Sequence, residues 1–112
     1  MNASLIRDDQ IVIEVNEDVS AGVAAYNANL PIKIEIIGVK VVAKATVASG
    51  TIKITDGTSD ITDTIACNTD KNVDRDSTLD YSKNIIDIGG TIKVQSNDSA
   101  VRARVYIEFV AA

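Results

Sequence analysis

Apolar and polar residues alternate with a two-residue period along most of this chain, and that period constrains the fold more than any other feature. Ile11, Ile13 and Val15 fall on one face of residues 11–15, and Ile52 and Ile54 do so in residues 51–55. Residues two apart share one face of a β-strand. The apolar residues are mainly Ile, Val and Ala, and β-branched side chains pack well on a pleated surface. The pattern therefore predicts strands.

The alternating segments are short and are separated by turns every eight to twelve residues, which is typical of a sandwich or barrel. We expect a single antiparallel β-sandwich domain, jelly-roll-like, over residues 10–112, because 112 residues provide for one hydrophobic core. Residues 77–88 are the only segment where a helix is plausible, with one short helical turn at most, capped by Ser77 or Thr78 and carrying Leu79, Tyr81 and Ile85. A polar surface loop is expected over 68–76. The strands are predicted at 11–15, 22–26, 32–45, 51–55, 61–66, 91–95 and 101–110.

The longest predicted strand, 32–45, changes phase in its middle. Ile32, Ile34 and Ile36 alternate with polar residues, after which Ile37, Val39, Val41, Ala43 and Ala45 take over the inner face. A β-bulge or corner near Gly38 would produce this change. A strand that is buried on both faces is the alternative.

Composition limits the functions that we expect. The chain has no histidine, which removes the commonest general base and the usual zinc ligand, so we expect no enzyme and no cofactor. The net charge of −5 argues against nucleic acid as a partner. The lone Cys67 is expected to be a small buried apolar residue. The longest apolar stretch, 32–48, is interrupted by charges, so we expect no membrane span and a protein made in the cytoplasm.

Carboxylates are the only abundant reactive groups. Oxygen ligands at alternate positions of one loop resemble the first half of an EF-hand, but Arg75 occupies the position that needs glycine and Tyr81 that of the bidentate Glu. A solvated acidic loop is therefore the preferred interpretation over a calcium site. Paired carboxylates for glycoside hydrolysis could come from Asp56, Asp60 and Asp63, although nothing singles out two of them. The calcium candidates are Asp70, Asn72, Asp74 and Asp76, followed by Asp80.

The last strand, 101–110, points four polar side chains outward: Arg102, Arg104, Tyr106 and Glu108. Arg and Tyr are enriched at protein interfaces, so these residues are candidates for a contact surface. An ordinary solvated sheet face is the alternative.

From residue 32 onward the chain resembles the small β-sandwich proteins that decorate tailed-phage capsids or form the base of head fibres. The resemblance lies in a glycine-led strand with an Asp-Gly turn, a segment rich in Ile and Thr, a double-glycine strand and the terminal strand. The residues that carry it are Gly50-Thr51-Ile52-Lys53-Ile54-Thr55-Asp56-Gly57, Ile61-Thr62-Asp63-Thr64-Ile65-Ala66-Cys67, Thr69-Asp70-Lys71, Gly89-Gly90-Thr91-Ile92-Lys93-Val94 and Arg104-Val105-Tyr106-Ile107.

The resemblance implies a structural virion protein on the capsid surface, a homo-oligomer, with a trimer expected, and the major capsid protein as partner. Residues 1–9 would be a flexible N-terminal arm that orders on docking. A β-sandwich carbohydrate-binding or adhesin module is the alternative. The absence of Trp counts against it, because sugar binding uses flat aromatic rings.

Overall fold

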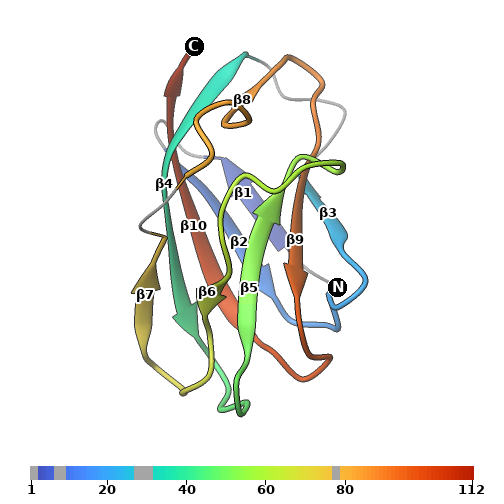
Figure 1. The fold of residues 1–112 in the computed structure, drawn as a ribbon, viewed down its shortest axis with the longest axis vertical. Helices are drawn as coiled ribbons and strands as arrows, with labels where there is room; N and C mark the ends of the chain where they lie inside the picture. The colour runs from blue at the N-terminus through green and yellow to red at the C-terminus, as the bar shows by residue number, and fades with distance from the viewer. Residues whose placement is uncertain (1–2, 7–9, 27–31, 77–78) are drawn as a thin grey trace.

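The computed structural model describes residues 3–6, 10–26, 32–76 and 79–112, and it shows two antiparallel β-sheets that face each other (Figure 1). Sheet A has the strand order β1-β2-β10-β4-β7, with β8 also paired to β4, and sheet B has the order β3-β9-β5-β6. The predicted all-β class and antiparallel β-sandwich are confirmed. The strands are β1 Ala3–Ile6, β2 Gln10–Val15, β3 Val23–Tyr26, β4 Ile34–Ala43, β5 Thr51–Thr55, β6 Ile65–Ala66, β7 Val73–Arg75, β8 Ile85–Ile86, β9 Ile92–Ser96 and β10 Ala103–Ala111.

One hydrophobic core lies between the sheets and follows the predicted alternation. Ile52 and Ile54 of β5 and Ile92 and Val94 of β9 pack from sheet B. From sheet A the inward residues of three strands meet them, and each is almost completely buried. These residues are Ile11, Ile13 and Val15 of β2, Ile34, Ile36, Val39, Val41 and Ala43 of β4, and Ala103, Val105, Ile107 and Phe109 of β10.

The phase change in β4 is a β-bulge, as predicted. Glu108 of β10 is opposite Gly38, but the next residue, Phe109, is opposite Ile36, so Ile37 is the extra residue. Ile36 is buried, whereas Ile37 is 50% exposed. The expectation that Ile37 begins the new inner face was therefore wrong, and that face resumes at Val39. An extra unpaired residue restores the inward direction of the residues that follow it.

Two adjacent isoleucines thus have opposite surroundings, and truncating them should have different effects. Ile36→Ala should lower the free energy of unfolding by about 2–5 kcal/mol, because it leaves a cavity in the core. Ile37→Ala should change it by no more than about 0.5 kcal/mol, because the side chain is at the surface. Urea titration of both variants measures the difference, and equal losses would contradict the bulge.

Asn84 covers the bulge at the edge of sheet A. β10 pairs with β4 along one edge, whereas on the other edge β8 and β7 pair only with its two ends, so the middle of that edge has no paired strand among the described residues. There the backbone N–H of Ile36 donates to the Asn84 carbonyl at 2.8 Å, and the Asn84 side-chain amide donates to the Ile36 carbonyl at 2.9 Å. Asn84 is buried, so both main-chain groups of Ile36 are satisfied away from water.

Removing the Asn84 side chain should destabilise the sandwich. Asn84→Ala leaves the buried Ile36 carbonyl without its side-chain donor, at a cost of about 1–3 kcal/mol. Asn72→Ala is the matched control, because Asn72 is exposed and should change stability by less than about 0.5 kcal/mol. Chemical denaturation of the two variants tests this, and an unaffected Asn84→Ala variant would show that the bond contributes little.

The described residues 79–88, part of the only segment where a helix was plausible, contain no helix. This segment has a turn closed by the Lys83 N–H donating to the Asp80 carbonyl at 2.9 Å, and then β8. Leu79 is buried but Tyr81 is 75% exposed, so they do not share an apolar helix face. The residues 77 and 78, proposed as caps, lie outside the described residues. Pairing of Ile86 with Ile34 on the edge of β4 provides main-chain bonds that a helix here would forgo.

Two further boundaries differ from the prediction. In the predicted strand 61–66 only Ile65–Ala66 pairs regularly. Regular alternation over 61–66 would place Asp63 on the same side as Ile61 and Ile65, but Asp63 is exposed whereas they are buried. Ile61 and Thr62 instead both donate their N–H groups to the carbonyl of Ile54. The predicted loop 68–76 contains a strand, β7, which pairs with β4.

The segment expected as an N-terminal arm lies partly in the sheet. The backbone of β1 pairs with β2 from Ala3 opposite Glu14 to Ile6 opposite Ile11. Residues 1, 2 and 7–9 of the same segment lie outside the described residues. In this structure residues 3–6 are therefore part of sheet A.

Gly50 and Gly90, which precede strands β5 and β9, are both needed because a side chain would not fit at either position. A Cβ atom at Gly50 would lie 2.6 Å from the Cys67 carbonyl oxygen, and one at Gly90 would lie 2.5 Å from a methyl carbon of Ile86. Close approach of a neighbouring segment therefore requires glycine at both positions. The sequences of 50–54, Gly-Thr-Ile-Lys-Ile, and of 90–94, Gly-Thr-Ile-Lys-Val, are nearly the same, and the shared glycine reflects this common constraint.

Candidate interaction surface

The outer face of sheet A arranges polar side chains in rows across its strands. Directly opposite residues of antiparallel strands lie on the same face, with Cβ atoms about 5 Å apart. Arg104 of β10 is opposite Glu14 of β2 on one side and Val42 of β4 on the other. Tyr106 forms the next row, between Val12 and Lys40. Arg75 of β7 extends this row beyond Lys40.

Direct contacts link these side chains. The guanidinium of Arg104 forms an ion pair with Glu14 and also donates to the Tyr106 hydroxyl at 3.5 Å. The ammonium of Lys40 lies 4.5 Å from the centre of the Tyr106 ring, in a cation–π contact. The Tyr106 hydroxyl, followed by Glu14, raises the pKa of Arg104 above its usual value.

A second ion pair lies beside the first group. Arg75 Nη1 is 2.8 Å from Glu108 Oε1, which joins β7 to β10 across β4. Gly38 lies between these strands, and a side chain there would meet the Glu108 carboxylate at 3.6–3.7 Å. We call the whole set the outer ladder. Its members are Glu14, Lys40, Arg75, Arg104, Tyr106 and Glu108.

Three of the four predicted interface residues belong to the outer ladder, and Arg102 does not. The Arg102 guanidinium donates to the carbonyls of Ser99 and Val101, both at 2.8 Å, and so holds the loop before β10. Sequence reasoning missed Glu14, Lys40 and Arg75. Their outward position follows from alternation, but their approach to Arg104 and Tyr106 depends on which strands are neighbours.

Exposed ion pairs of this kind contribute only about 0.2–1 kcal/mol each to stability. The outer ladder therefore adds little to the fold. The contacts of the outer ladder instead hold long, flexible side chains in defined positions on a broad sheet face. A surface ordered in this way loses less side-chain entropy when a partner binds.

The predicted calcium candidates do not form a winding loop. Asp74 lies in the extended strand β7, opposite Val41 and on the side facing the other sheet. The Asp70 N–H donates to the Thr46 hydroxyl, and the Asp76 N–H donates to the Val39 carbonyl. Asn72 is exposed. Within the described ranges, no group of three or more His, Cys, Asp or Glu side chains is placed to hold a metal ion.

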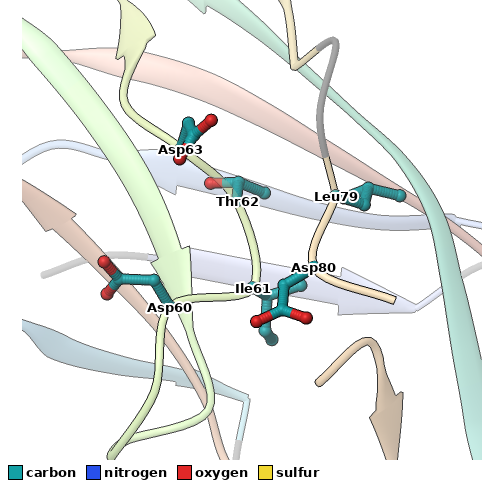
Figure 2. A pocket seen from close by; sticks show the side chains of 6 residues that line it. All are labelled: Asp60, Ile61, Thr62, Asp63, Leu79 and Asp80. Atoms are coloured by element: carbon teal, nitrogen blue, oxygen red, sulfur yellow. The ribbon is translucent and has the colours of Figure 1, made fainter. Parts of the chain in front are cut away.

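A shallow pocket of about 310 Å³ lies between the segment before β6 and the segment before β8. Ile61, Thr62 and Leu79 form part of its wall, and the carboxylates of Asp60, Asp63 and Asp80 point in different directions around it (Figure 2). Asp80 accepts bonds from the N–H and hydroxyl of Ser82, and these bonds lower its pKa. The carboxylates therefore do not converge on one point.

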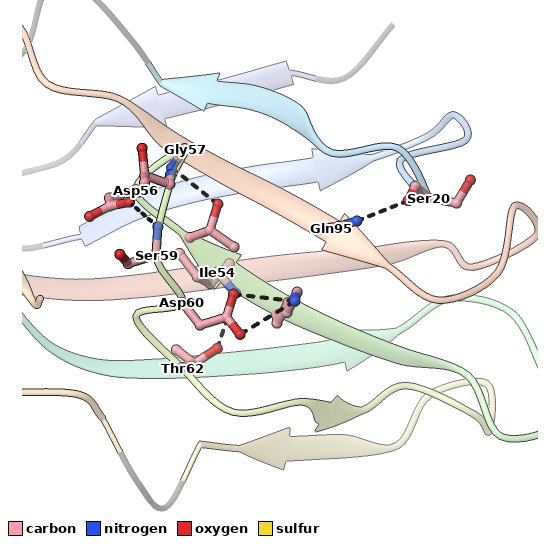
Figure 3. A network of polar contacts seen from close by, with 11 residues as sticks. Ser20, Ile54, Asp56, Gly57, Ser59, Asp60, Thr62 and Gln95 are labelled. Carbon is pink, nitrogen blue, oxygen red and sulfur yellow. Dashed lines mark hydrogen bonds and ion pairs between the residues drawn. The ribbon is translucent and has the colours of Figure 1, made fainter.

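The other candidate carboxylates also have structural partners (Figure 3). Asp56 accepts the N–H groups of Ser59 and Thr58, and the bond from Ser59 is the main reason that its pKa is lowered. Asp60 lies 3.2 Å from the ammonium of Lys53. The buried Thr62 hydroxyl accepts the N–H of Ile54. Asp56 and Asp60 therefore organise the loop after β5.

Cys67 is a buried residue, as predicted. Its side chain is 1% exposed, and its sulfur lies 3.8 Å from the Arg102 carbonyl. Burial, with a smaller contribution from Asp74, raises the pKa of the thiol to about 11. A thiol with so high a pKa is a poor nucleophile at neutral pH.

The raised pKa makes a pH-dependent prediction for stability. Above about pH 9 the unfolded chain loses the Cys67 proton, whereas the folded chain keeps it until about pH 11. Stability should therefore fall as pH rises through this window. Urea unfolding at pH 8 and pH 10.5 should show a larger loss for the natural chain than for Cys67→Ala. An identical loss in both would contradict the assignment, because the Lys and Tyr contributions are common to them.

Comparison of the chain with protein-family models, with curated proteins and with solved structures gives no match. No helix in the described part of the chain is long and apolar enough to cross a membrane.

Proposed function

We propose that this chain is a non-enzymatic structural protein of a tailed-phage particle. In this proposal it decorates or stabilises the outer surface of the capsid, or forms the base of a head fibre. It works through the outer face of sheet A and has the major capsid protein as its partner. The observation that carries the proposal is the outer ladder, a set of charged and aromatic side chains ordered on one broad sheet face.

The strand connectivity supports the proposal. Without β1 and β8, sheet A has the order β2-β10-β4-β7 and sheet B the order β3-β9-β5-β6. Among these eight strands, each one lies in the other sheet from the strand before it, except β6, which follows β5 in sheet B and pairs with it. We infer from this order a jelly roll, in which eight strands form two four-stranded sheets. Jelly rolls occur in viral capsid proteins and in lectins, so this fold is compatible with the proposal without deciding it.

The mechanism would be mechanical. Arg and Tyr are the residue types that most often dominate interface energies, and Arg104 and Tyr106 lie on the central strand of the face. Many copies, each with modest affinity, would together hold adjacent shell subunits, because linked contacts add in avidity.

Binding to capsids tests the proposal directly. The purified chain is mixed with expanded, undecorated capsids of the virus that encodes it, and the bound fraction is measured by co-sedimentation. The natural chain should bind with sub-micromolar affinity. Arg104→Ala and Tyr106→Ala should each weaken binding about tenfold or more, because they remove central contacts.

Lys93→Ala is the matched control. Lys93 is a cation on β9, a central strand of sheet B, so the variant removes a similar charge from the opposite sheet. It should bind like the natural chain, and circular dichroism checks that all variants are folded. Absence of binding by the natural chain, or equal losses for Lys93→Ala and Arg104→Ala, would contradict the proposal.

A carbohydrate-binding module is the second candidate, and one feature of sheet B favours it. A shallow pocket of about 200 Å³ is lined by hydrogen-bonding side chains, namely Thr51, Lys53, Thr64, Gln95, Ser96 and Asn97. None of these residues is aromatic, which weakens the case because sugars stack on flat rings. A glycan array separates the two candidates, since specific glycan binding lost on Gln95→Ala would favour this one.

A further inference from the structure

Exposed apolar side chains gather at one end of sheet A. Among residues whose side chains are described, seven large apolar side chains are exposed, and five lie where β4 begins and β10 ends. Lys33 and Asp87 form an ion pair there, and the exposed Ile32 and Ile88 are their neighbours in the sequence. The five are Ile32, Ile37, Ile85, Ile88 and Val110. Contiguous exposed apolar groups mark interaction surfaces more often than scattered ones do.

A carboxylate lies in the middle of this group. Glu35 of β4 is directly opposite Val110 of β10 on one side and Ile85 of β8 on the other. The side chain of Glu35 forms no hydrogen bond or ion pair with any residue in the described ranges, and the nearby Lys33 is 3.7 Å from Asp87. We call Glu35, Ile37, Ile85 and Val110 the Glu35 patch. It presents apolar area around an uncompensated negative charge.

The opposite end of sheet A, where β7 rather than β8 lies beside β4 (Figure 1), carries positive charge instead of negative charge. Val73 of β7 is 56% exposed and lies opposite the half-buried Val42. Lys44 and Lys71 are close to each other, because the Lys71 N–H donates to the carbonyl of Ala43 at 2.7 Å. Neither ammonium has a partner among the described residues. We call Val42, Val73, Lys44 and Lys71 the Val73 patch, which presents apolar area beside two positive charges.

We propose that the Glu35 patch of one copy binds the Val73 patch of a second copy. Opposite charges and apolar area on the two patches make them complementary, whereas two Glu35 patches brought together would place like charges in contact. Two copies related by a two-fold axis can make this contact twice and close as a dimer, whereas a head-to-tail arrangement closes into a ring or extends as a filament, depending on the rotation between copies. The inference rests on the proposed function, because it supplies the self-association that a shell-decorating protein would use.

Charge reversal with rescue tests this contact. Sedimentation velocity and light scattering of the natural chain at increasing concentration should show assemblies larger than a monomer. Glu35→Lys, and separately Lys44→Glu with Lys71→Glu, should each weaken association at least about tenfold, because like charges then face each other. The triple variant, which carries all three reversals, should restore association, because opposite charges meet again.

Asp63→Lys is the control, since it reverses an exposed charge that belongs to neither patch. A strictly monomeric natural chain, a Glu35→Lys variant that associates normally, or a triple variant that stays dissociated would each overturn the inference. Capsid binding distinguishes this failure from that of the proposed function. A monomer that binds capsids overturns only the contact between the two patches, whereas an assembly that never binds capsids overturns the proposed function.

Discussion

β10 lies between β2 and β4 in sheet A, and the pairing of these three strands determines both the core and the outer face. Its inward residues are almost completely buried from Ala103 to Ile107, while Arg104, Tyr106 and Glu108 alternate with them on the opposite side. Because the side-chain period of a strand is two, burial of one set requires exposure of the other. The register that satisfies the core therefore also positions the outer ladder.

The bulge in β4 connects this register to the Glu35 patch. Ile37 is inserted opposite the step from Glu108 to Phe109, so the residues on both sides of it keep their inward partners in β10. An apolar side chain is left outside the core as a result. Asn84 then satisfies the main chain of Ile36, and β8 brings Ile85 next to Glu35. A local irregularity that preserves the core thereby helps to create an exposed apolar surface around a carboxylate.

Several of the Asp side chains have local structural partners in the loops. Asp18, Asp56 and Asp80 accept hydrogen bonds from residues two or three positions later in the chain, and Asp60 pairs with Lys53. Short polar side chains that bond to nearby backbone groups are common in turns. These four carboxylates therefore shape the loops between strands.

Alternation alone indicated that the chain is built of β-strands, which side of β2, β5, β9 and β10 faces inward, and that β4 must change phase. These are local properties, because the direction of a side chain depends only on its position along its own strand. Tertiary structure alone decided that Ile37 is outside, that 79–88 form a turn and β8 rather than a helix, and that Glu14, Lys40 and Arg75 join Arg104, Tyr106 and Glu108. Those outcomes depend on which strands become neighbours and in what register. Pairings between residues up to 98 positions apart, such as Glu108 with Gln10, set that arrangement, and no local pattern encodes them.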